Sequence, residues 1–289
     1  MAEILDAFPE FLELWQEVSH LDIARQIDAW ASRQKAKWPD LLQMQIEDYA
    51  SQGVDWKEIA ATRVFPRIPH AVPGMREAHA RLHHVLLPAY EAVARALDHH
   101  FPVTFVIHVG IGCGAGWATQ FRGKPAVLFG LENLVDSGVL SEDAIQGLVT
   151  HELGHVVHDL WRLEAGKQDG DGPWWQLYRE GFAQHCEVWI RDARHQGLGQ
   201  DGSDGLEWCR QNRSWLAAEF LRRTDAGEEV RDFFGSWYEI HGRSETGYFL
   251  GHEVIAELAR SASLKQIALL DTYEAQCRSI LERFGLRGA

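Results

Sequence analysis

Residues 150–157 read THELGHVV, which places the pattern H-E-x-x-H inside an otherwise apolar run. Two histidines four positions apart on a helix project from one side, because they are separated by about 40° around the helix axis. His151 and His155 have this spacing, and paired imidazole nitrogens are suitable ligands for a tetrahedral zinc ion. Glu152 follows the first histidine directly, where it is placed to accept a proton from a water molecule on such an ion.

The residues around this pattern favour a buried helix. Positions 148–157 contain leucine, valine, threonine and glycine apart from His151, Glu152 and His155. Burying these three polar side chains without partners would be costly, and a metal ion is the simplest partner common to them. The alternative is that both histidines are hydrogen-bonded core residues and that the glutamate lies on the surface.

Composition limits the classes of function. The net charge of −14 argues against binding to nucleic acid or to an anionic membrane surface, and it is compatible with a peptide or protein substrate. Residues 1–10 lack the features of a secretory signal, and no apolar run has transmembrane length. The four cysteines are scattered without C-x-x-C spacing, so we expect a cytoplasmic protein without a disulfide framework. The sequence does not indicate an oligomeric state.

Residues 1–100 have the apolar periodicity of helices, and we expect a helical N-terminal extension there. Proline is frequent in residues 63–73, which predicts a loop before a long helix at 74–98. Histidines are concentrated at 79–84 and 99–100. Because no carboxylate or cysteine pattern accompanies these histidines, we interpret them as surface and helix-end residues.

A β-rich segment follows, and we predict a small sheet within residues 102–131. Strands are expected at 101–109, 117–121 and 126–131, with the last two paired as a hairpin. Several glycines precede the second strand, among them Gly114 and Gly116. On an edge strand these glycines would let an extended peptide approach and bind beside the sheet. A plain loop is the alternative.

Two helices are expected to carry the metal site. Ser141 is a suitable N-cap for a helix over 141–163, which includes the H-E-x-x-H pattern. A loop rich in glycine and aspartate separates it from a second helix over 174–195. This second helix contains the sequence EGFA at residues 180–183.

The combination of H-E-x-x-H with a later helix carrying EGFA resembles the gluzincin group of zinc peptidases. Residues 174–183 are similar to the third-ligand helix of M1-type aminopeptidases, and residues 245–251, ETGYFLG, resemble the YjaZ-like predicted zinc proteases. The resemblance covers about residues 103–265 and implies that Glu180 is the third ligand of one Zn²⁺ ion. It also implies a zincin-like α+β fold, mostly helical, with a small mixed or antiparallel sheet beside the H-E-x-x-H helix. Residues 101–289 would then form the metallopeptidase domain.

The sequence departs from the family pattern in three respects, the first being that the gap between His155 and Glu180 is longer than in M1 enzymes. Gln184 stands where many gluzincins have an aspartate that orients a histidine ligand. The M1 motif G-x-M-E-N, whose glutamate holds the substrate amine, is matched only in part by FGLEN at residues 129–133. Glu132 is therefore a candidate for substrate binding, and an aminopeptidase-like activity depends on it.

The C-terminal part is expected to be helical, with helices near 208–223, 230–238, 245–260 and 263–284. Tyr248 and His252 lie one turn apart on the third of these helices. By resemblance to M1 enzymes, Tyr248 would stabilise the oxyanion of the reaction, with His252 as the substitute. Both residues could equally be buried and hydrogen-bonded without a catalytic role.

Taken together, the residues predict a zinc-dependent peptidase with His151, His155 and Glu180 as ligands and Glu152 as general base. Two alternatives remain open. The chain could be a catalytically silent zincin-like module that binds metal or peptide and regulates another protein. It could also bind no metal, in which case the histidine pattern is structural.

Overall fold

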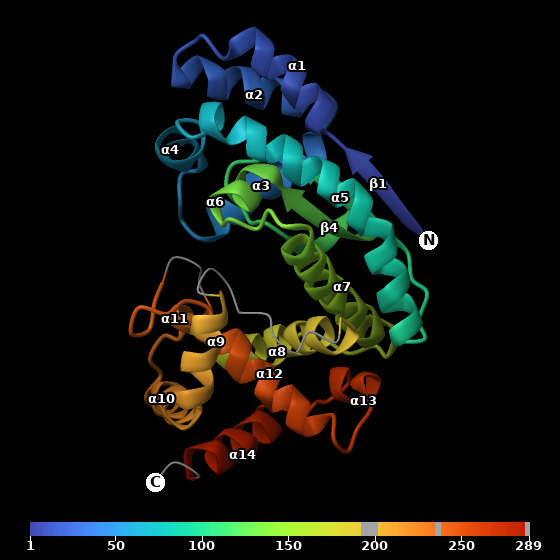
Figure 1. The fold of residues 1–289 in the computed structure, drawn as a ribbon, viewed down its shortest axis with the longest axis vertical. Coiled ribbons are helices and arrows are strands. Elements are labelled where there is room, and N and C mark those ends of the chain that lie inside the picture. Colours follow the sequence, from blue (N-terminus) through green and yellow to red (C-terminus); the bar gives the residue numbers. More distant parts are fainter. Residues whose placement is uncertain (192–201, 235–237, 287–289) are drawn as a thin grey trace. The chain divides into compact units, whose positions relative to one another are not determined.

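The computed structural model describes residues 1–191, 202–234 and 238–286 (Figure 1). In the described residues the elements are, in chain order, β1 (Ala2–Asp6), α1 (Phe8–Val18), α2 (Ile23–Lys37), α3 (Pro39–Ser51), α4 (Trp56–Ile59), the π-helix η1 (Ala60–Val64), α5 (Ile68–Ala96), β2 (Val103–His108), β3 (Trp117–Phe121), β4 (Lys124–Gly130), α6 (Leu131–Asp136), α7 (Glu142–Glu164), α8 (Gly172–Ile190), α9 (Gly202–Gln211), α10 (Arg213–Ala226), α11 (Arg231–Phe234), α12 (Thr246–Leu258), α13 (Leu264–Ala268) and α14 (Tyr273–Leu286). The chain divides into two compact units, 1–152 and 153–289, and the division falls inside α7.

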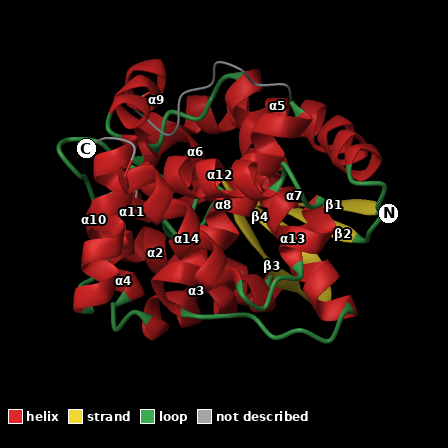
Figure 2. Cartoon of the chain, turned by 90° about the horizontal axis from the view of Figure 1, so that it is seen from below, coloured by secondary structure: helices red, strands yellow, loops and turns green. Residues whose placement is uncertain are grey.

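The first unit contains a four-stranded mixed sheet with the strand order β1-β2-β4-β3 (yellow in Figure 2). β1, β2 and β4 are parallel, and β3 is antiparallel to β4. The predicted hairpin of the second and third expected strands is thus confirmed, with its turn at Arg122 and Gly123, both of positive φ. The expectation of a mostly helical α+β protein with a small sheet is confirmed as well.

The N-terminal segment was expected to be entirely helical, and this is wrong at its first residues. Residues Ala2–Asp6 form β1, which pairs in parallel with β2 in the register Ala2 to Val103. Five residues are too few for a periodicity that separates a strand from a helix, and the pairing partner is far along the sequence. The proline-rich stretch also differs from the expected loop, because α5 begins at Ile68 and includes Pro69 and Pro73. The compact units divide at residue 152, and the expected domain boundary at residue 100 stays a prediction.

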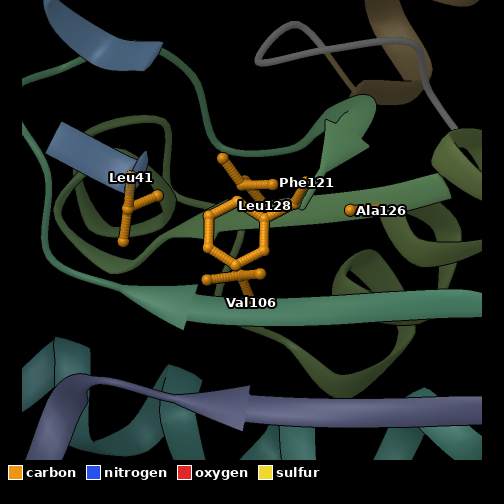
Figure 3. Packing of buried hydrophobic residues seen from close by; sticks show 5 residues of the cluster. All are labelled: Leu41, Val106, Phe121, Ala126 and Leu128. Carbon is orange, nitrogen blue, oxygen red and sulfur yellow. The ribbon is translucent and has the colours of Figure 1, made fainter. Parts of the chain in front are cut away.

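One face of the sheet is covered by α3. Figure 3 shows Leu41 of α3 against the sheet residues Val106, Leu128 and Phe121, and all four are at most 1% exposed. Alternate residues of a strand lie on the same face, so the residues paired with Val106 and Leu128 also contribute to this layer. Leu5 on β1 and Trp117 on β3 have these positions, and both pack against the cluster.

The regular elements of the second unit are all helices among its described residues, which also contain one isolated β-bridge between Ile240 and Arg243. The helix expected at 174–195 is α8, which ends at Ile190, and residues 192–195 lie outside the described part of the chain. The helix expected at 208–223 is two helices, α9 and α10, separated at Asn212. The helix expected at 230–238 is the short α11, and residues 235–237 lie outside the described part.

Candidate metal centre

Helix α7 begins as the sequence predicts. Ser141 Oγ accepts a hydrogen bond from the backbone N–H of Ala144 at 3.1 Å, which caps the first turn. Glu142 and Asp143 place negative charge at this end, where the helix dipole favours it. The helix continues without interruption to Glu164, and it therefore presents His151 and His155 one turn apart on one side.

A glycine allows the second helix of the site to approach α7 closely. A Cβ atom on Gly154 would lie 3.0 Å from the Cα of Ala183 on α8 and 3.2 Å from the Cβ of Cys186. A larger residue at position 154 would therefore force the two helices apart. The close packing brings Glu180 of α8 to His155 of α7, with His155 Nε2 and Glu180 Oε2 separated by 3.1 Å.

The three expected ligands form one group. His151, His155 and Glu180 each offer a ligand atom, and these three atoms lie within 4.8 Å of one another. Two bonds of about 2.0–2.1 Å at a tetrahedral angle place their donor atoms about 3.3 Å apart, close to the 3.1 Å between His155 and Glu180. Both histidines are buried and Glu180 is largely buried, so the group of two nitrogens and one oxygen could hold a metal ion.

Glu152 is buried against the start of the edge strand β3. Its Oε2 atom accepts a hydrogen bond of 2.9 Å from the backbone N–H of Ala118. A Cβ atom on Gly116 would lie 2.7 Å from Oε1 of Glu152, so this position has no room for a side chain. The carboxylate that follows His151 is therefore held at a fixed place beside Gly116 and Ala118.

Glu180 is next to an ion pair between Arg179 and Asp159. The guanidinium of Arg179 donates to both oxygens of Asp159, at 2.9 and 3.3 Å, and one of its nitrogens is 4.0 Å from Glu180 Oε1. Burial alone would raise the pKa of Asp159, but hydrogen bonds from His158 and Arg179 lower the pKa below its usual value. His158 is fully buried among Trp175, Tyr178 and Phe182, and burial lowers its pKa. The sequence offered Asp159 as a residue that could orient a histidine ligand, but its pairing with Arg179 was not predicted, because the two residues are 20 positions apart.

Glu132, in the first turn of α6, contacts the loop that joins β2 to β3. Its Oε2 accepts from the N–H of Gly110 at 2.9 Å and its Oε1 from that of Gly112 at 3.2 Å. Gln45 accepts from the N–H of Ile111 at 3.1 Å in the same loop. Burial raises the pKa of Glu132, and the two backbone N–H groups oppose this shift. Both oxygens of Glu132 therefore fix the loop.

The two glycines expected on an edge strand lie in this loop region instead. Gly114 and Gly116 precede β3, which begins at Trp117. Both glycines therefore lie in a loop, as the alternative interpretation of the sequence expected. Gly114 has a φ of 150°, which L-residues rarely adopt, and its carbonyl oxygen lies against Gly130. The role of Gly114 and Gly116 in substrate binding stays a prediction.

Tyr248 and His252 both lie on α12, but neither contributes an atom to the group of three ligands. The ring of Tyr248 contacts that of Phe234, with centroids 6.0 Å apart. The ring of His252 stacks on His185 of α8 at 5.2 Å. Burial lowers the pKa of His252 and of His185 to about 4, so both imidazoles are neutral at pH 7. Catalytic roles for Tyr248 and His252 stay predictions.

The sequence and the structure were compared with those of known proteins. No protein-family model matches the sequence, and neither a curated protein nor a solved structure matches it significantly. Among the described residues there is no helix with the combined length and apolar character needed to cross a membrane.

Proposed function

We propose that this chain is a zinc-dependent peptidase of the gluzincin type. The observation that carries the proposal is the grouping of His151, His155 and Glu180 within ligand distance of one another. Two imidazoles and one carboxylate are a common set of protein ligands at catalytic zinc, because three ligands leave a fourth position for water or substrate. The EGFA sequence and the H-E-x-x-H pattern agree with this assignment, and a zincin-like arrangement of sheet and helices is part of the proposal.

When bound there, zinc would lower the pKa of a water molecule to about 7 and polarise the substrate carbonyl. Glu152 supplies the proton transfers. Its Oε2 is held by the N–H of Ala118, which leaves Oε1 to accept the proton of the attacking water. The same oxygen would then deliver this proton to the departing amine.

The substrate would be an extended peptide that lies along β3. Among the described strands, β3 is at the end of the sheet and has β4 as its single neighbour. A peptide can add to such an edge through backbone hydrogen bonds, and the absence of a side chain at Gly116 lets Glu152 lie beside the start of this strand. Tyr248 is our candidate for stabilising the oxyanion, with His252 as the substitute.

The assignment of Glu132 to a substrate amine is not part of this proposal. Both of its oxygens already accept hydrogen bonds from the loop at Gly110 and Gly112. We therefore propose peptide-bond hydrolysis without specifying cleavage at an amino terminus. Mass-spectrometric analysis of cleaved peptides distinguishes terminal from internal cuts.

The decisive experiment replaces the proposed base and keeps the ligands. Glu152→Gln is expected to retain zinc in elemental analysis, whereas peptide hydrolysis falls by about 10²- to 10⁴-fold. Glu142→Gln is the matched control, because Glu142 lies on the same helix but is exposed. Unchanged hydrolysis in Glu152→Gln would overturn the proposed mechanism. Zinc in the wild-type protein without cleavage of a broad peptide library would instead identify a metal-binding module.

A further inference from the structure

A second group of metal-ligand side chains lies in the first unit, at the junction of β1 and α5. Asp6 is the last residue of β1, and His79 and His83 are four positions apart on α5. One ligand atom from each of these residues lies within 4.8 Å of the other two. None of the three belongs to the group formed by His151, His155 and Glu180.

The two histidine rings of this group face the same oxygen atom of Asp6. Oδ2 of Asp6 is 2.8 Å from Nε2 of His79 and 3.0 Å from Nε2 of His83. Both imidazoles therefore present the same nitrogen to the same carboxylate oxygen. Histidines at i and i+4 on a helix can both coordinate one ion, because they project from the same side.

The surrounding residues orient two of the three side chains. Oδ1 of Asp6 accepts a hydrogen bond of 3.1 Å from the N–H of Phe8, so the carboxylate is fixed with Oδ2 toward the histidines. The ring of Phe8 also lies against His79, with centroids 4.9 Å apart. Partners outside the coordination shell commonly orient metal ligands in this way.

Exposure distinguishes this group from the buried one. The side chains of Asp6 and His79 are 23% and 24% exposed, and that of His83 is 40% exposed. An ion could reach these ligands from solvent, and water could complete its coordination. Nitrogen and oxygen donors in this combination suit Zn²⁺, Co²⁺ or Ni²⁺ better than Ca²⁺ or Mg²⁺, which prefer oxygen ligands throughout.

We propose that Asp6, His79 and His83 form a second site for a divalent transition-metal ion, which connects the first strand of the sheet to α5. The site is exchangeable and stabilises this junction when it is occupied. It does not depend on the proposed peptidase function, because it uses other residues and requires no reaction.

The test is a zinc titration of chelator-treated full-length protein by isothermal calorimetry, with wild type compared to His83→Ala. The wild type is expected to bind one more equivalent of zinc per chain than His83→Ala. This difference is the same whether or not the group of His151, His155 and Glu180 also binds zinc. Zinc should also raise the melting temperature of the wild type more than that of His83→Ala. Asp6→Asn should weaken the same binding event.

His84→Ala is the matched control. His84 is the next residue on α5, is 74% exposed and contacts Glu142 rather than the group. It is expected to bind as many equivalents as the wild type, so that adventitious binding to surface histidines is separated from the site. Equal stoichiometry in wild type and His83→Ala, or an equal loss in both histidine variants, would overturn the proposal. Asp6, His79 and His83 would then be linked by hydrogen bonds alone and would not bind a metal ion.

Discussion

Gly181 of α8 and Gly251 of α12 lie backbone against backbone. A Cβ atom on Gly181 would be 2.6 Å from the Cα of Gly251, and a Cβ atom on Gly251 would be 2.7 Å from the Cα of Gly181. Real side chains do not tolerate such distances, so the two helices keep their separation only with glycine at both positions. Gly181 directly follows Glu180, so this contact contributes to the position of the third candidate ligand of the proposed metal centre.

Gly251→Ala is expected to force α8 away from α12. Overpacking of this kind costs about 1–3 kcal/mol, and displacement of Glu180 should also weaken zinc binding. Urea unfolding and a zinc titration measure the two effects. Gly285→Ala is the control, because Gly285 lies in α14 with no atom within 4 Å of an added Cβ, and alanine there should be neutral or slightly stabilising. Equal stability of the two variants would contradict the packing argument.

Gly116→Ala should act through Glu152. The added methyl group would meet Oε1 of Glu152 and displace the carboxylate from the N–H of Ala118. Peptide hydrolysis is therefore expected to fall while zinc content is unchanged. In the Glu152→Gln background the same substitution should cause little further loss, because the two changes affect one group. Full additivity of the two losses would show that Gly116 acts independently of Glu152.

Glu132→Gln tests whether this residue fixes the loop or binds substrate. Glutamine offers one acceptor oxygen in place of two, so one N–H of Gly110 or Gly112 loses its partner. A buried group without a partner costs about 1–3 kcal/mol, and stability to urea should fall accordingly. The ratio of cleavage rates for peptides with free and acetylated amino termini should stay constant. A selective loss with free amino termini would restore the role in amine binding.

The stacked pair His185 and His252 predicts a dependence of stability on pH. Burial lowers the pKa of each imidazole to about 4 in the folded protein, against about 6.5 for an unfolded chain. The unfolded state therefore binds more protons between these values. The contribution of this pair to the free energy of unfolding should be constant above about pH 6.5 and decline as the pH falls toward 4.

His252→Phe removes one of these titrating groups and keeps an aromatic ring for the stack. The decline between pH 6.5 and 4 should become shallower in this variant, as measured by urea unfolding at several pH values. His84→Phe, at an exposed position, serves as the control. An unchanged slope in His252→Phe would show that this histidine does not contribute to the pH dependence.

Local signals in the sequence predicted the elements that carry the site. Helix α7 was expected over 141–163 and runs from Glu142 to Glu164, because its cap and its apolar periodicity are both local. Strand β3 was expected at 117–121 and has these limits. Glu180 was found through the EGFA pattern, and the structure groups it with both histidines.

Features that depend on distant residues were missed. Asp6 and His79 are 73 residues apart, so no spacing rule connects the carboxylate with the histidines of α5. The anchoring of the loop by Glu132 depends on contacts 20 and 22 residues away. The start of α5 was misplaced because prolines usually indicate a loop, whereas Pro69 lies in the first turn, where the missing N–H has no helical partner to lose.

The pairing of β1 with β2 has a consequence for the order in which the protein assembles. Ala2 is opposite Val103, so the first strand emerges during synthesis about a hundred residues before its neighbour exists. Helices α1 to α5 can form in that interval, but the sheet cannot be completed. Closing so long a loop carries an entropic cost that slows folding. The amino-terminal strand is therefore expected to join last, after the later strands have been made.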